Sequence, residues 1–278
     1  MSTVRIINNT FESLSRTVKK QASLVVTSPP YNLRTKAKRK ITNRRNGGYD
    51  LKSFGYIDGY ADDMPEAEYQ QSQIDFIKFC FDELLKENGL LVYNHKDRRR
   101  NGHMISPWEI LLQMKQYSIE VWHELIWNRG STHNHCPDIP TPIHEGVYIL
   151  KRFHDEGRSC VFNKPSSADG GFDDVFHMPK SPKQKFTDKN GKEVRHCAPF
   201  PIDLPLKFIS AFSNPGDLIC DPYSGSGTTM VAAHKLNRDF IGTETNTDYY
   251  NMSIERVLQH NPLDIERKRK STIIAFNS

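Results

Sequence analysis

The stretch that decides the fold is DLICDPYSGSGTTMVAAHKLNRDFIGTE, which spans residues 217–244. It predicts a short apolar strand, a glycine-rich turn, a helix over residues 228–236 and a second strand. Gly225 and Gly227 permit positive φ angles and a close approach of the backbone to a ligand. The start of the following helix offers N–H groups without a partner inside the helix, together with the positive end of the helix dipole. The turn can therefore bind a nucleotide-like ligand.

An acidic residue stands where such a site would need one. Glu244 follows the second strand, about 20 residues after the turn, and a carboxylate there can accept hydrogen bonds from ribose hydroxyls. Two related motifs do not fit. No Lys follows Gly227, so a triphosphate would find no cation, and a dinucleotide fingerprint would need more than Gly225-Ser226-Gly227. A turn with a purely structural role is the remaining alternative.

A second motif, Thr27-Ser28-Pro29-Pro30-Tyr31-Asn32, directly follows the apolar run of residues 24–26. Two consecutive prolines cannot extend a β-ladder, so the chain must leave the sheet at this point and hold one shape. Ser28 adds a hydroxyl that donates or accepts, and Tyr31 adds a flat ring over which a base can stack. The pattern indicates a rigid pocket for a planar base. A plain Pro-Pro turn after a strand is the alternative.

Together these motifs resemble those of a known family. Ser28-Pro29-Pro30-Tyr31, placed before DPYSGSGTT at 221–229, is similar to the S-adenosylmethionine-dependent DNA amino-methyltransferases of the β group, in which the catalytic motif precedes the cofactor motif. The segment HCAPFP at 196–201 and the amphipathic run over 202–212 are similar to the part that precedes the cofactor turn in this group. The resemblance implies a three-layer, Rossmann-like α/β methyltransferase fold with a mainly parallel twisted sheet, permuted motif order and a small inserted recognition region.

The resemblance also implies a reaction and a cofactor. A site-specific DNA methyltransferase would transfer a methyl group from S-adenosyl-L-methionine to the exocyclic amine of a base flipped out of the duplex. Ser28 Oγ and the Pro29 carbonyl would accept hydrogen bonds from that amine, Pro30 would complete the catalytic motif, and Tyr31 would stack on the base. The residues expected to hold the cofactor are Asp221, Pro222, Ser224, Gly225, Gly227, Thr228, Glu244 and Phe200.

The first position of the catalytic motif bears on the target base. Ser28 at this position is more common among family members that modify cytosine N4, so cytosine N4 is the expected target and adenine N6 the alternative. An alternative of another class is a catalytically inactive DNA-binding module. Double-stranded DNA is the expected partner, in the context of a restriction-modification system. The sequence leaves open whether a restriction endonuclease is paired with the chain and whether the chain acts as a monomer or a homodimer.

A basic segment follows the second motif closely. The formal net charge is +5, and the span from Arg34 to Arg45 holds seven basic residues and no acidic one. Lysines and arginines so near Tyr31 would bind DNA phosphates and release counterions. A solvated surface loop is the alternative. The candidate DNA contacts in this loop are Arg34, Lys36, Lys38, Arg39, Lys40, Arg44 and Arg45.

The segment from Lys151 to Arg195 is rich in Gly, Pro, Ser, Asp and Lys and shows little periodicity. It resembles the target-recognition region of the family in its position. Proteins that recognise specific DNA sequences place long polar side chains at base edges, and Lys180 and Lys183 are candidates for such contacts. An ordinary surface insertion is the alternative.

Periodicity predicts the order of the remaining elements. Strands are expected over 4–7, 23–27, 90–94, 119–127 and 146–150, and helices over 11–19, 107–114 and from Pro65 to a stop at Gly89. Strands that alternate with helices favour a mainly parallel sheet. The expected parts are a catalytic half (1–151, with a basic loop at 33–64), a target-recognition region (152–195), a cofactor-binding half (196–262) and a basic tail (263–278).

Several other classes of protein are not indicated. No apolar run approaches the roughly 18 residues of a membrane span and the first 20 residues lack the apolar block of a signal peptide, so a cytoplasmic location is expected. Five cysteines at wide spacing predict reduced thiols. The group His133, His135 and Cys136, with His144 nearby, lacks the spacing of a metal site, so no metal is expected.

Overall fold

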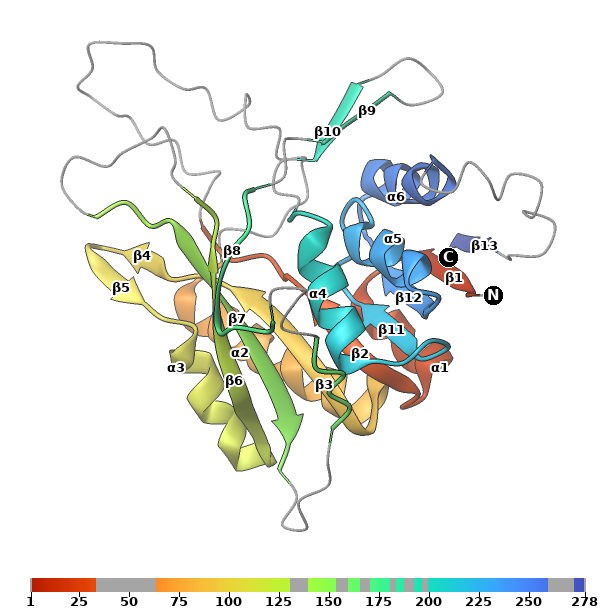
Figure 1. Cartoon of the computed structure of the whole chain (residues 1–278). Helices are drawn as coiled ribbons and strands as arrows, with labels where there is room; N and C mark the ends of the chain where they lie inside the picture. The colour runs from red at the N-terminus through yellow and green to blue at the C-terminus, as the bar shows by residue number, and fades with distance from the viewer. Residues whose placement is uncertain are drawn as a thin grey trace.

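Figure 1 shows a computed structural model of the chain. The structure describes residues 2–33, 64–130, 140–153, 160–165, 171–180, 184–187, 193–196, 200–259 and 273–277. The basic segment from Arg34 to Arg45, Lys183, and the group His133, His135 and Cys136 lie outside these residues.

One sheet of nine strands runs through the described part of the chain, in the order β13-β1-β12-β11-β2-β3-β7-β6-β8. In that order the strands are Ile273–Asn277, Val4–Asn8, Asp239–Thr243, Leu218–Asp221, Ala22–Thr27, Leu85–His95, His144–Arg152, Ile119–Asn128 and Val175–His177. All neighbouring pairs are parallel except the two that involve β7, which runs antiparallel to both β3 and β6. The sheet is therefore mainly parallel, as predicted.

Helices cover both faces of the sheet and complete three layers. Figure 1 shows α4 (Asp203–Phe212) and α5 (Thr228–Lys235) on the near face, with α2 (Glu66–Phe79) behind. The face of α4 and α5 also carries α6 (Thr247–Gln259), and the face of α2 carries the short helices α1 (Ser15–Val18) and α3 (Trp108–Leu111).

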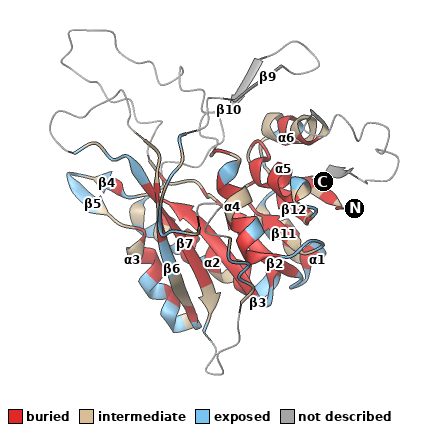
Figure 2. Cartoon of the chain, in the orientation of Figure 1, coloured by how far each residue is buried: buried red, intermediate tan, exposed pale blue. Residues whose placement is uncertain are grey.

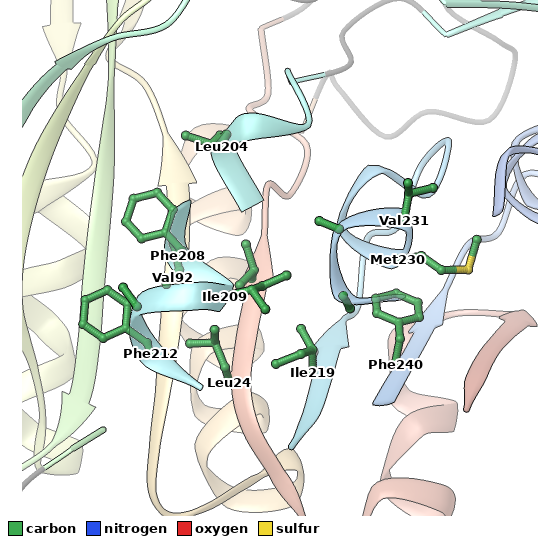
Figure 3. Close-up of a cluster of buried hydrophobic side chains, with 14 of the residues drawn as sticks. Leu24, Val92, Leu204, Phe208, Ile209, Phe212, Ile219, Met230, Val231 and Phe240 are labelled. Atoms are coloured by element: carbon green, nitrogen blue, oxygen red, sulfur yellow. The ribbon is translucent and has the colours of Figure 1, made fainter. Parts of the chain in front are cut away.

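Two apolar clusters hold these layers together. Leu24 and Val26 of β2 belong to the cluster under α4 and α5, whereas Val25 belongs to the cluster under α2. Side chains of a strand alternate between faces, so an all-apolar strand such as β2 can support a helix layer on each side. Figure 2 shows the central strands as almost wholly buried, and Figure 3 shows Phe208 and Ile209 of α4 near Leu24.

The helix that begins after Pro65 ends earlier than the sequence indicated. The helix α2 gives way to a π-helical turn over Cys80–Leu84, and β3 already begins at Leu85. Gly89 does not stop the helix. It lies within β3, where the pairing with β2 is irregular and where a Cβ atom would approach Leu85 Cδ2 to 2.8 Å. A Cβ atom would also lie 3.0 Å from the carbonyl oxygens of Ala22 and Lys86, so the irregular backbone around Gly89 favours glycine there.

The other expected helices are also shorter. Residues 11–19 form a 3-10 turn over Phe11–Leu14 and the single helical turn of α1, and residues 107–114 form α3 followed by a 3-10 segment over Leu112–Tyr117. The strand boundaries agree with the predictions within a few residues, apart from the early start of β3.

Three regions contain strands that periodicity did not reveal. The insertion contributes β8 to the edge of the main sheet, and β9 (Gln184–Thr187) pairs with β10 (Glu193–His196) as a separate hairpin. A second hairpin joins β4 (Arg98–Arg100) to β5 (His103–Ile105). Within the expected C-terminal tail, β13 pairs in parallel with β1. Strands this short give too few residues for alternation to be recognised.

Within the described ranges, none of the helices has both the length and the apolar composition needed to traverse a bilayer.

We predict that Phe208→Ala destabilises the fold strongly. Phe208 is fully buried between α4 and the sheet, so its truncation leaves a cavity and should lower the free energy of unfolding by about 3–5 kcal/mol. Phe162, which is 45% exposed and stacks on Phe212, is the matched control, and Phe162→Ala should cost about 1 kcal/mol or less. Urea denaturation measures both. Equal losses would contradict the assignment of the core.

Candidate functional site

The two motifs meet at the carboxyl ends of neighbouring parallel strands. The strands β2 and β11 pair directly, through Leu24 with Ile219 and Val25 with Cys220. At their ends Thr27 Oγ1 donates a 2.8 Å hydrogen bond to Asp221 Oδ1, and this bond is buried. The Ser28–Tyr31 corner and the glycine-rich turn therefore start side by side, although 194 positions separate Thr27 from Asp221.

The glycine-rich turn adopts left-handed backbone angles, which its two glycines allow. The φ angle is +51° at Gly225 and +78° at Gly227, in the left-handed region that favours glycine. Ser224 secures the turn, because its hydroxyl donates to the Asp221 carbonyl at 2.9 Å and its N–H donates to Thr243 O at 3.0 Å. At Gly227 a Cβ atom would lie 2.6 Å from Ser253 Cβ of α6. Gly227 therefore allows α6 to pack against the turn.

Glu244 lies beside this turn. It follows β12, and its Oε1 atom accepts a 2.7 Å hydrogen bond from the N–H of Asn246. Burial raises the pKa of Glu244 to about 7, against the lowering effect of hydrogen bonds from the backbone N–H groups of Asn246 and Gly225. The contact with Gly225 brings the carboxylate to the turn, as the spacing in the sequence indicated.

Asp221 has a different environment from the one its motif suggests. Asp221 is 1% exposed, and its carboxylate accepts hydrogen bonds from Thr27 Oγ1 and from the N–H of Tyr223. Burial raises the pKa of Asp221 to about 6, although these hydrogen bonds favour the charged form. The carboxylate thus binds the protein itself and shapes the turn.

Arg256 holds the outer side of the turn and was not found from the sequence. Its guanidinium donates to the carbonyl and the hydroxyl of Ser226, the latter at 3.0 Å, and to Thr228 Oγ1 at 3.2 Å. Burial lowers the pKa of Arg256 to about 10. No sequence signal marked this arginine, because it lies on α6 about 30 residues beyond the turn.

Two buried aromatic side chains, Tyr69 and His95, support the Pro-Pro corner. Tyr69 Oη donates to the Pro30 carbonyl at 2.7 Å and lies 2.7 Å from His95 Nε2. Because Tyr69 has one hydroxyl proton, Nε2 of His95 must carry the proton between them, and Nδ1 accepts from the N–H of Lys96 at 2.8 Å. Burial lowers the pKa of His95 to about 3, so this ring is neutral.

The hydroxyl of Tyr31 is the centre of a polar cluster. Its Oη atom lies 2.6 Å from Ser28 Oγ, accepts from Asn94 Nδ2 at 2.7 Å and donates to Glu145 Oε2 at 3.2 Å. Its ring lies 4.8 Å from the His95 ring, at an interplanar angle of 42°. The corner therefore holds Tyr31 from both its ring and its hydroxyl.

A buried ion pair completes this cluster. Arg129 Nη1 lies 2.8 Å from Glu145 Oε1, and both side chains are about 9% exposed. Lys180 lies close to the pair: burial lowers its pKa first, the charge of Arg129 lowers it further, and Glu145 raises it. Lys180 thus lies within electrostatic range of the ion pair. Asn94, Glu145 and Arg129 were not singled out from the sequence.

The remaining predicted residues are placed as follows. The carbonyl of Pro222 accepts from Thr243 Oγ1 at 2.7 Å, and Phe200 packs, partly buried, on the core cluster that contains α4. His144 is exposed at the start of β7. Within the described part of the chain, no three His, Cys, Asp or Glu side chains are grouped so that they could hold a metal ion.

The fold and the site define a class of protein: a Rossmann-like α/β methyltransferase fold whose Ser-Pro-Pro-Tyr motif precedes its glycine-rich turn in the chain. Residues 22–255 match the model of the N6/N4 family described as DNA methylase. The chain belongs to this family, which confirms the resemblance drawn from the motifs.

Named relatives agree with this placement. The type II methyltransferase M.HinfI of Haemophilus influenzae is 23% identical over 92% of this chain and 68% of its own length. The type II beta methyltransferase M.BslI of a Bacillus species is 27% identical over 68% of this chain and 23% of its own length. M1.MboII of Moraxella bovis is 48% identical over 29% of this chain and 31% of its own length. The chain thus spans about a quarter to a third of the latter two.

Solved structures share the fold. The cytosine-N4-specific PvuII DNA methyltransferase matches with a TM-score of 0.67 and 18% identity, over 100% of this chain and 96% of that one. A DNA modification methylase from Thermus thermophilus, complexed with S-adenosyl-L-methionine, matches with a TM-score of 0.65 and 20% identity, over 100% and 99%. These matches confirm the predicted fold class.

We predict that Asp221→Asn reduces the dependence of stability on pH. The pKa of Asp221 in the folded protein, about 6, exceeds its value of 3.8 as a free side chain. Its contribution to stability is therefore fully present below about pH 4 and is lost as the pH rises through about 6. Between about pH 5 and about pH 8 the wild-type free energy of unfolding should lose about 1–2 kcal/mol that the variant retains. Urea denaturation at both pH values measures this. Parallel losses in the two proteins would contradict it.

We predict that Gly227→Ala costs more stability than Gly216→Ala. Both glycines have positive φ, +78° and +85°, so both substitutions carry a backbone penalty. Only at Gly227 would the new methyl group also overlap Ser253, whereas at Gly216 it would meet no atom within 4 Å. The overlap should add about 1–3 kcal/mol to the loss at Gly227. Thermal unfolding of both variants tests this, and equal losses would show that α6 does not pack closely on the turn.

Proposed function

We propose that this chain is a DNA methyltransferase that transfers a methyl group from S-adenosyl-L-methionine to the exocyclic amine of a base flipped out of duplex DNA, with cytosine N4 as the preferred target. One observation carries the proposal: the hydrogen bond between Thr27 and Asp221 starts the Ser-Pro-Pro-Tyr corner and the glycine-rich turn at one edge of the sheet. Membership of the DNA methylase family supports it.

The residues around the turn fit S-adenosyl-L-methionine. Gly225 and Gly227 keep the turn free of side chains at positive φ, and Glu244 presents a carboxylate beside it for ribose hydroxyls. When bound, the cofactor supplies an electrophilic methyl group on its sulfonium sulfur. Gly225, Gly227, Thr228 and Glu244 would hold it directly, Phe200 would form a wall, and Asp221, Pro222 and Ser224 would shape the turn.

The corner at Ser28 would prepare the amine. An exocyclic amine is a poor nucleophile because its lone pair is delocalised into the ring. Ser28 Oγ and the Pro29 carbonyl would accept hydrogen bonds from the amine, which localises the lone pair and stabilises the charge that develops during transfer. Tyr31 would stack on the base and offset part of the cost of flipping it. Alignment of the reacting atoms would contribute further.

Basic residues near the corner would bind the duplex. The charges of Arg129 and Glu145 act on Lys180, so Lys180 lies near the ion pair and would contact DNA beside the corner. We further propose phosphate or base contacts by Lys183 and by the segment Arg34–Arg45, which begins three residues after Tyr31. Relatives named as type II methyltransferases support a role in a restriction-modification system.

We predict that the purified protein methylates duplex DNA and that Ser28→Ala slows transfer by about a hundredfold, because the amine loses a preorganised acceptor. Labelled methyl groups on unmethylated genomic DNA report the rate, and mass spectrometry of the digested nucleosides should find N4-methylcytosine. Ser210→Ala, at an exposed serine of α4 whose hydroxyl donates to a carbonyl of its own helix, is the matched control and should keep the rate.

Other results would redirect the proposal. N6-methyladenine as the product would overturn the preference for cytosine and keep the reaction. Binding of S-adenosyl-L-methionine and DNA with no transfer to any duplex would favour the catalytically inactive DNA-binding module.

A further inference from the structure

The cluster around Tyr31 fixes which of its atoms carry protons. An amide nitrogen only donates and an ionised carboxylate only accepts. Asn94 Nδ2 faces both Tyr31 Oη, at 2.7 Å, and Glu145 Oε2, at 3.0 Å. Because the amide nitrogen of Asn94 already donates to Tyr31 Oη, the hydroxyl of Tyr31 must direct its one proton elsewhere.

Two acceptors compete for that proton. Ser28 Oγ lies 2.6 Å from Tyr31 Oη and Glu145 Oε2 lies 3.2 Å from it. A carboxylate is the stronger acceptor, since hydrogen bonds to ionised groups are roughly twice as strong as those between neutral groups. Tyr31 therefore donates to Glu145, and Ser28 must donate its own proton to Tyr31. The lone pairs of Ser28 Oγ are then left to accept.

Arg129 keeps this order in place. Its guanidinium lies 2.8 Å from Glu145 Oε1, so the carboxylate is charged and held at both oxygens. The pair is also fixed by the backbone, because Glu145 of β7 lies opposite Trp127 of β6, two residues before Arg129. The Glu145 carboxylate accepts from Arg129, Asn94 and Tyr31, whereas Nε of Arg129 is buried without a hydrogen-bond partner among the described residues.

An unused acceptor lies in the same corner. Among the described residues, Asn94 Oδ1 is buried and has no hydrogen-bond partner. Buried polar atoms of this kind are rare unless a ligand or water satisfies them. Asn94 Oδ1 is thus a spare buried acceptor on the same amide that donates to Tyr31 and Glu145, whereas Ser28 Oγ and the Pro29 carbonyl remain the two acceptors that match the two donors of an amino group.

We propose that Glu145 is a positioning residue that sets the direction of the hydrogen-bond chain, so that Ser28 accepts from the target amine instead of donating to it. The inference rests on the proposed function and adds to it a residue on β7 that acts through Tyr31. In the free protein the chain runs from Ser28 through Tyr31 to Glu145. The acceptor that the amine requires therefore exists before the base arrives.

The isosteric variant Glu145→Gln tests this directly. Its amide oxygen would face Arg129 and its amide nitrogen would face Asn94 and Tyr31, so Tyr31 would donate to Ser28 and the Ser28 proton would point at the amine. We expect the single-turnover rate of methyl transfer to fall about a hundredfold. The dissociation constants for S-adenosyl-L-methionine and for duplex DNA should stay within about twofold of wild type, because the corner acts on the reacting amine.

A double-mutant cycle separates this role from a merely structural one. Tyr31→Phe removes the hydroxyl through which Glu145 acts and leaves the ring. In the Tyr31→Phe background, Glu145→Gln should therefore change the rate by less than about twofold. Glu120→Gln is the matched control, because Glu120 pairs with Lys151 across the same two strands at the far end of the sheet, at 3.5 Å. It should keep the wild-type rate.

The outcomes are distinct. No transfer by the wild-type protein would overturn the proposed function, and the inference with it. Transfer by wild type and at an equal rate by Glu145→Gln would overturn the inference alone. A loss that persists in the Tyr31→Phe background would assign Glu145 to structure. Should Glu145→Gln fail to fold, Glu145→Leu combined with Arg129→Met removes the buried pair as a whole and leaves Ser28 as the acceptor for the Tyr31 proton, with the same expected loss.

Discussion

A buried hydrogen bond of 2.8 Å between Thr27 and Asp221 joins the ends of two strands that lie 194 positions apart in the chain. It forms only if β2 and β11 are neighbours, parallel and in one register, because a slip of one residue would turn every side chain to the opposite face. The Ser-Pro-Pro-Tyr corner and the glycine-rich turn both begin at this bond. Each piece of the site therefore inherits its position from the pairing of two apolar strands.

The polar groups around this bond are buried at a cost, and each is held by the protein. Burial raises the pKa of Asp221 and of Glu244, and it lowers the pKa of Arg256 and of His95. Asp221, Glu244 and His95 accept hydrogen bonds from the backbone N–H groups of Tyr223, Asn246 and Lys96. Arg256 of α6 donates to the Ser226 hydroxyl in the turn. Such mutual satisfaction makes a polar site rigid, which a reaction that depends on alignment requires.

Short sequence patterns predicted the parts of the structure that depend on neighbouring residues in the chain. The glycine-rich turn, the Pro-Pro corner and the mainly parallel sheet were predicted because each leaves a signal within a few residues. Asn94, Glu145 and Arg129 leave none, since a polar residue at a strand end is ordinary and only the register of β3, β7 and β6 brings these three together. The prediction of a helix end at Gly89 was wrong for a related reason. A glycine can follow a helix or lie in an irregular part of a strand, and only the pairing of β3 with β2 distinguishes the two.

The direction of β7 explains how Glu145 enters the site. In a parallel sheet the side chains of a site come from the carboxyl ends of strands. Because β7 runs antiparallel to β3, its beginning lies at that edge, where Gly146 pairs with His95 and Val147 with Asn94. The strand β6 is antiparallel to β7 in turn, so Arg129 follows its carboxyl end at the same edge. One reversed strand thus supplies a carboxylate that parallel strands alone would place at the far side of the sheet.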